Sequence, residues 1–174
     1  MQARPEGLVT GTTGAFVGRL YSSTAASTTI TNGTGAQTYD VTYTLPANSL
    51  LLAGDTLRIR GLVECTAANA AETFTVVVRV GGTAIFNSGD VDVAANDLCS
   101  FDLIFSARAA AGATVACVAS GGGGWNTAAQ NMVSGGLTAT NFATNGALVV
   151  DVQITYSAAG GNSSNLAQLV IDAG

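Results

Sequence analysis

The chain has 174 residues, enough for one domain, and a formal net charge of -5 that comes from eleven carboxylates set against six arginines. Nucleic-acid binding and attachment to a membrane surface both begin with a basic field, and no apolar run approaches the roughly 20 residues of a membrane span, so the composition argues against both partners. The absence of histidine and lysine also removes Ser-His-Asp and Cys-His catalysis, the commonest zinc ligand and Schiff-base chemistry.

The first residues of the chain, 1–13, include a proline and two glycines and show no hydrophobic periodicity. We expect them to form an extended N-terminal arm that becomes ordered against a neighbouring molecule, with Arg4 and Pro5 as candidate partner contacts. The segment also lacks an apolar core of signal-peptide length, so we expect the chain to be made and kept in a cytoplasm. Residues 14–174 are expected to form a single β domain.

The first half of this domain shows the two-residue alternation of half-buried strands. Strands are predicted at residues 14–21, 27–31, 38–45 and 55–66. Pro46 ends the third of them, since proline cannot donate a hydrogen bond to a sheet ladder. Gly61 lies in the middle of the fourth and predicts a bulge or a bend.

The centre of the chain is predicted to be an antiparallel hairpin over residues 72–87. Its first strand alternates a set of apolar residues with a second, largely polar set. Gly81-Gly82 suits the two-residue turn that follows, because that turn needs positive φ. Arg79 lies on the polar face. Since it is one of only six cations in an acidic chain, we expect it to meet a carboxylate, in this chain or in a neighbour.

The second half of the domain continues the pattern, with strands predicted at residues 98–108, 114–120, 136–141, 147–157 and 166–172. Residues 121–146 are predicted to be irregular apart from the weak strand at 136–141. No segment shows the period of an amphipathic helix. The whole pattern predicts an all-β fold, an antiparallel β-sandwich or jelly roll of about eight strands.

Without histidine or lysine, the remaining catalytic arrangement is a pair of carboxylates, as in glycoside hydrolysis. Glu64 and Glu72 bracket one loop, but each also fits a solvated charge at a strand end, which we favour. Cys65, Cys99 and Cys117 lie in apolar runs without C-x-x-C spacing, and we expect buried free thiols. We therefore expect no enzymatic activity and no catalytic residues.

An acidic loop follows the hairpin and contains Asp90, Asp92 and Asp97. These carboxylates could gather oxygen ligands for calcium. The loop lacks the downstream glycine and glutamate of an EF-hand loop, however, and we favour an exposed acidic loop without a metal. We expect no cofactor elsewhere in the chain.

Four glycines at residues 121–124 precede the only tryptophan, Trp125. Neither a lysine nor a helical pattern follows them, so they do not predict a phosphate-binding loop, and we expect a flexible or tightly bent loop. Trp125 could stack on a sugar ring, but we favour an anchor in a core or a subunit interface. Asn32 and Asn162 begin sequences that match glycosylation acceptors, and we expect these to be chance matches.

Three segments share a distinctive pattern of strands and turns: TYTLPANSLLLAGDTLRIRG (residues 42–61), TFTVVVRVGGTAIF (73–86) and LVVDVQITYSAAGGNSSNLAQLVIDAG (148–174). Together they resemble structural proteins of tailed bacteriophages. The resemblance implies a jelly-roll-like virion protein with no active site, made in the host cytoplasm, that either decorates the capsid surface or belongs to the tail. For a decoration protein it implies a homotrimer, with the major capsid protein or neighbouring virion subunits as partners.

Three functions stay open at this point. The first is a capsid decoration or cement protein, which stabilises the shell through many weak contacts. The second is a tail or fibre component that contacts the host receptor, with residues 121–136 as its recognition surface. The third is a carbohydrate-binding β-sandwich module, in which Trp125 and tyrosines would stack on sugar rings.

Overall fold

The computed structural model describes residues 18–69, 72–127 and 131–174, with the backbone alone for residues 131–138. Within these ranges the chain is all-β, as predicted, and contains no helix that could cross a membrane. The predicted N-terminal arm, with Arg4 and Pro5, lies outside the described residues. The strands are β1 Gly18–Ser22, β2 Ile30–Thr31, β3 Gln37–Thr38, β4 Tyr43–Leu45, β5 Thr56–Ala67, β6 Thr73–Val80, β7 Thr83–Asn87, β8 Val91–Asp92, β9 Leu98–Ala107, β10 Val115–Trp125, β11 Asn131–Phe142, β12 Leu148–Tyr156 and β13 Ser163–Ala173.

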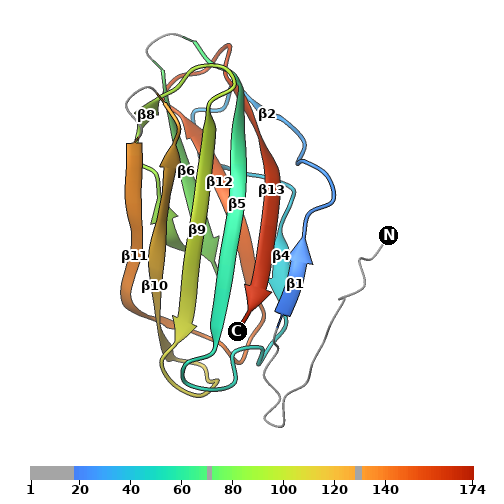
Figure 1. Ribbon diagram of the computed structural model, residues 1–174, viewed down its shortest axis with the longest axis vertical. Coiled ribbons are helices and arrows are strands. Elements are labelled where there is room, and N and C mark those ends of the chain that lie inside the picture. Colours follow the sequence, from blue (N-terminus) through green and yellow to red (C-terminus); the bar gives the residue numbers. More distant parts are fainter. Residues whose placement is uncertain (1–17, 70–71, 128–130) are drawn as a thin grey trace.

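These strands form two antiparallel sheets that pack face to face (Figure 1). Sheet A has the order β1-β13-β5-β9-β10-β11, and β2 adds to β13. Sheet B has the order β3-β12-β6-β7, with β4 on β12 and β8 on β6. The predicted antiparallel β-sandwich is confirmed, with more strands than expected because several of them have only two or three residues.

The strand order is that of a jelly roll with one added hairpin. The last two strands lie inside their sheets: β13 lies between β1 and β5, and β12 lies between β3 and β6. Because the chain alternates between the sheets along much of its length, each sheet interleaves early strands with late ones. β10 and β11 extend sheet A beyond β9 (Figure 1), so β1 and β11 are its two edges.

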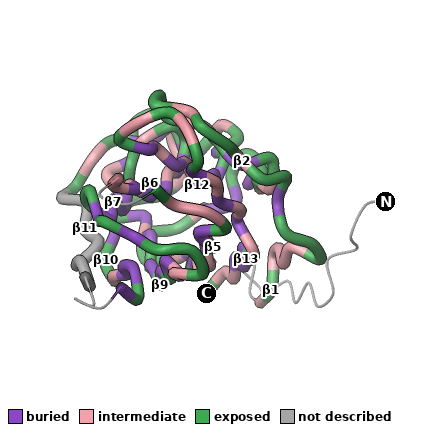
Figure 2. Tube along the Cα trace, turned by 90° about the horizontal axis from the view of Figure 1, so that it is seen from above, coloured by how far each residue is buried: buried purple, intermediate pink, exposed green. Residues whose placement is uncertain are grey.

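The core lies between the sheets and is made of the residues that the alternation assigned to one face of each strand (Figure 2). The alternating apolar residues of four strands line this core, with at most 6% of each residue exposed. These residues are Leu57, Ile59 and Val63 on β5, Phe74, Val76, Val78 and Val80 on β6, Phe101, Leu103 and Phe105 on β9, and Leu148, Val150, Val152, Ile154 and Tyr156 on β12.

The predicted strand at residues 38–45 is interrupted in the structure, because β3 ends at Thr38 and β4 begins at Tyr43. Asp40 lies in the gap, and its carboxylate accepts hydrogen bonds from the backbone N–H and the hydroxyl of Thr28. This contact fixes a bend where the alternation predicted a continuous strand. The inward positions on either side of the gap are still buried, at Tyr39 and Leu45.

The glycines of the two central strands have different roles. Gly81 and Gly82, with φ of 54° and 80°, form the predicted two-residue turn between β6 and β7. Gly61 was predicted to form a bulge or a bend, and the bulge is wrong, because the register of β5 with β9 is continuous across Gly61. The nearby register shift lies on the partner strand β13, between Leu166 and Gln168. A Cβ atom at Gly61 would lie 2.3 Å from the Phe101 ring, so the glycine makes room for that ring in the core.

The largest error of the sequence prediction concerns residues 121–146, which were expected to be mostly irregular. Residues 121–124 belong instead to β10, which pairs with β9 on one side and β11 on the other. A Cβ atom at Gly123 would lie 2.3 Å from the Ser100 carbonyl oxygen, so glycine is needed for the close approach of β9. A run of glycines thus marks a tightly packed strand here rather than a loop.

Candidate interaction surface on the outer face of sheet A

The outer face of sheet A carries charged residues because its strands alternate. On β5, Leu57 and Ile59 point into the core, so Arg58 and Arg60 between and after them point outward. The same alternation on the neighbouring strands places Asp102 of β9 and Asp172 of β13 on this face. Two arginines of one strand therefore lie between carboxylates on both adjacent strands.

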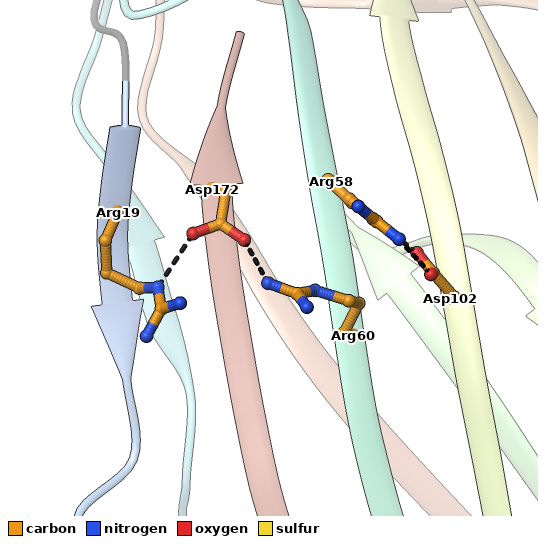
Figure 3. Close-up of polar contacts among 5 residues, drawn as sticks. All are labelled: Arg19, Arg58, Arg60, Asp102 and Asp172. Carbon is orange, nitrogen blue, oxygen red and sulfur yellow. Dashed lines mark hydrogen bonds and ion pairs between the residues drawn. The ribbon is translucent and has the colours of Figure 1, made fainter.

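These side chains form two groups of ion pairs (Figure 3). Asp172 accepts a hydrogen bond from Nε of Arg19 at 2.7 Å and from a terminal guanidinium nitrogen of Arg60 at 2.5 Å. Arg58 donates two hydrogen bonds to the two oxygens of Asp102, at 2.8 and 2.5 Å, the bidentate geometry that guanidinium and carboxylate favour. Together the contacts connect β1, β13, β5 and β9 across the surface.

Both carboxylates are held in their charged form. The hydrogen bonds from Arg58 lower the pKa of Asp102 below its usual value. For Asp172, partial burial works in the opposite direction, but the hydrogen bonds from Arg19 and Arg60 outweigh it and the pKa is lowered as well. The face therefore keeps its paired charges throughout the physiological pH range.

A shallow depression of about 290 Å³ lies beside these ion pairs. It is lined by Thr56, Arg58, Ile104, Asp172, Ala173 and Gly174. Ile104 is 44% exposed, which makes it the most exposed large apolar side chain among the described residues. The depression thus combines one apolar contact with charged groups that are already paired, and it suits a protein surface better than a small molecule, which normally needs a deeper cleft.

Arg79 also meets a carboxylate, as predicted. Its Nε donates to Asp151 on the adjacent strand β12 at 2.7 Å, and the two residues are direct partners in the register. The side chains are only 26% and 7% exposed, so the pair is largely covered. Because Arg79 is used within the chain, its guanidinium is a poor candidate for a contact with a partner.

Trp125 is completely buried, and its ring packs edge-to-face on Phe74 with the centroids 5.9 Å apart. The interpretation as a core anchor is confirmed. Trp125 as a surface contact or sugar platform is wrong, since a side chain with no exposed area cannot stack on a ligand from solvent.

Three of the acidic residues singled out from the sequence, Asp90, Asp97 and Glu72, have local structural roles. The carboxylate of Asp90 accepts a hydrogen bond from the Thr75 hydroxyl, and that of Asp97 accepts one from the Ala94 N–H at 2.8 Å. Glu72 accepts a hydrogen bond from the Asn162 side chain. No group of three or more Cys, Asp or Glu residues that could hold a metal ion occurs within residues 18–69, 72–127 and 131–174.

Two further expectations concern buried residues. Cys65, Cys99 and Cys117 are free, buried thiols, as predicted. Asn162 is 1% exposed, and its amide is hydrogen bonded to Glu72 and to the Ala158 carbonyl, so it cannot accept a glycan in the folded chain.

A buried chain of hydroxyl groups was not predicted from the sequence. Tyr156 donates to the Ile30 carbonyl oxygen, so its single proton is used there. Ser164 must then donate to the Tyr156 oxygen, 2.7 Å away, and Tyr39 must donate to Ser164, 2.6 Å away. The three residues join β12, β13 and the segment after β3. The sequence feature that could have predicted it is the pair of tyrosines at inward positions, Tyr39 and Tyr156, because buried hydroxyl groups need hydrogen-bond partners.

Comparison with known proteins gives no family for this chain. No family model matches the sequence, and no curated protein matches it significantly. Among solved structures, the insecticidal delta-endotoxin Cry8Ea1 from Bacillus thuringiensis is 15% identical with a TM-score of 0.39, over 84% of this chain and 19% of the toxin chain. A structure of infectious bursal disease virus, Gx strain, is 16% identical with a TM-score of 0.32, over 99% of this chain and 45% of that chain. The chain spans less than half of either protein, and likenesses at this level assign no function.

Proposed function

We propose that the chain is a non-enzymatic structural protein of a virion, which decorates a tailed-bacteriophage head by binding the major capsid protein. The observation that carries this proposal is where the three phage-like segments lie. They cover β4 with the start of β5, the β6–β7 hairpin, and β12 with β13. In the sheets β12 pairs with β4 and β6, and β13 pairs with β5. Segments far apart in sequence thus form one connected part of the jelly roll.

The chemistry of the surface supports a binding role. The chain has no histidine or lysine, and the clustered charges on sheet A are paired with one another. The shallow depression around Ile104 gives that face an apolar contact point rimmed by polar groups, an arrangement typical of protein interfaces. We therefore take the outer face of sheet A as the surface that meets the capsid.

The location can be tested by quantifying the protein in purified virus particles and by imaging them with the protein labelled. A shell component is expected at on the order of hundreds of copies per particle, because shells repeat their subunits by symmetry. A dozen copies or fewer, localised at the tail, would replace the proposal with the tail or fibre role. Absence from the particles would contradict a virion role altogether.

The binding surface can be tested with capsids that lack the protein. Ile104→Asp is expected to weaken binding of the full chain, because it places a charge in the apolar part of the depression. Val149→Asp is the matched control, since Val149 is 39% exposed and lies on sheet B. Equal binding by the two variants would show that the outer face of sheet A is not the contact surface.

A further inference from the structure

The second edge of sheet A is formed by β11, which pairs with β10 and with no other described strand (Figure 1). The pairing is regular from Asn131 to Leu137, and the register shifts only beyond Leu137. Along this regular stretch the outer side of the strand carries the row of backbone N–H and C=O groups that any sheet edge presents. Such a row is a template for another strand.

Soluble proteins normally protect such edges with charged side chains, proline or short strands. β1, at the opposite edge, has 5 residues and carries Arg19. β11 has 12 residues, none of them charged and none of them proline. The uncharged region is wider still, because no charged residue and no proline occurs between Arg108 and Asp151. Residues 131–137 of the edge strand therefore lack charge, proline and bulge, the usual protections against strand pairing.

We propose that β11 pairs antiparallel with β11 of a second copy of this chain, so that sheet A continues across a two-fold axis. The charge distribution favours a second copy as the occupant. Each copy carries a net charge of -5, and two copies meet with least repulsion at the stretch that carries no charge. Two identical antiparallel strands are also self-complementary, as a two-fold interface requires.

The regular stretch fixes the register that gives the most overlap. When residues 131–137 of one copy pair with residues 131–137 of the other, Ser134 lies at the two-fold axis opposite its own counterpart. A charge introduced at residue 134 then faces an identical charge, which destabilises a cross-strand pair. This dimer goes beyond the proposed function, because it does not depend on where in a virion the protein lies.

The test is the mass of the full chain in solution, measured by sedimentation and light scattering over a range of concentrations. The wild type is expected to be a dimer. Ser134→Lys and Ser134→Asp are each expected to weaken the dimer by roughly 100-fold, because like charges meet at the axis. An equimolar mixture of the two variants is expected to restore a dimer. The control is Thr44→Lys on β4 of sheet B, which changes the net charge by the same amount as Ser134→Lys. It is expected to leave the dimer intact.

The mixture separates a lost contact from a lost fold, since misfolded chains would not complement each other. A wild type that is monomeric or trimeric at every concentration would overturn the proposal, as would a wild type that binds only to capsid protein. A dimer that survives both Ser134 substitutions would overturn it as well. These results are independent of the particle measurements that test the virion role.

Discussion

Arg60 lies directly opposite Asp102 in the register of β5 and β9, yet its guanidinium bonds to Asp172 on the strand at its other side. Arg58 does the reverse: it lies opposite Asp172 and bonds to Asp102. The two diagonal contacts cross over β5 and tie three strands together (Figure 3). Asp172 also accepts from Arg19, so it is the one carboxylate shared by two of these arginines.

Replacing the shared carboxylate is therefore expected to cost more than replacing the other one. Asp172→Asn leaves Arg19 and Arg60 without their charged partner, and we expect a loss of about 1 kcal/mol in the free energy of unfolding, since pairs near the surface contribute little each. Asp102→Asn removes a single ion pair, the one with Arg58, and that pair is more exposed to solvent. This substitution should therefore lower the free energy of unfolding by less. Urea denaturation of both variants measures the difference. An Asp102→Asn variant that is the less stable of the two would contradict the shared role of Asp172.

The same pairs predict how stability depends on pH. The pKa values of Asp102 and Asp172 are lower in the folded chain than in the unfolded chain, where they are near 3.9. The unfolded state therefore binds protons first, so the stabilisation is complete above about pH 5 and is lost as the pH falls through the lowered values. Urea midpoints between about pH 6 and pH 2 should decline more gently in Asp172→Asn than in the wild type. If the urea midpoints of the two proteins fall in parallel with pH, Asp172 does not contribute to the pH dependence of stability.

The buried thiols are expected to be unreactive in the folded protein. Burial raises the pKa of Cys65 to about 11 and that of Cys99 to about 12, and the pKa of Cys117 is raised for the same reason. At neutral pH almost no thiolate is present, and it has no access to solvent. A chromogenic disulfide reagent should therefore titrate no thiol in the native chain and all 3 after unfolding in denaturant. Rapid native labelling would mean that the sandwich opens readily.

The direction of hydrogen-bond donation in the buried hydroxyl chain predicts which substitution in it destabilises the fold more. Ser164→Ala leaves the Tyr39 proton without an acceptor in the core, which should cost roughly 2–3 kcal/mol. Tyr39→Phe removes that donor and leaves Ser164 still donating to Tyr156, so the cost should be nearer 1 kcal/mol. Thermal or urea unfolding of the two variants tests the order. The opposite ranking would mean that the protons run in the other direction.

Alternation predicted the strands that are half buried, because each inward residue had to be apolar for the core to form. That is why the inward faces of β6 and β12 follow directly from the sequence. The alternation carries no information about which strands become neighbours, so the diagonal pairs of Arg58 and Arg60 could not be predicted. The partner of Arg79 was predicted only as a carboxylate, since Asp151 becomes its neighbour through a pairing distant in sequence.

The β10 strand was missed for a different reason. Glycine has a low intrinsic preference for strands, and residues 121–124 therefore looked like a loop. In the sheet these glycines have no side chain to separate the strands, so the backbone of β9 can approach closely. Local preference is overridden here by packing between strands, and no feature within the segment itself reveals the neighbour that requires it.

The close approach of β9 to β10 predicts that Gly123→Ala destabilises the fold. The new Cβ would lie 2.3 Å from the Ser100 carbonyl oxygen and 2.8 Å from the Phe101 Cα, both backbone atoms that cannot rotate away. Separating β9 from β10 to make room should cost about 2–3 kcal/mol, comparable with overpacking a core. Gly35→Ala is the matched control, since a Cβ there meets nothing within 4 Å, and it should change stability by less than about 0.5 kcal/mol. Urea unfolding compares them, and a Gly123→Ala protein as stable as the control would show that the glycines are not needed for close packing.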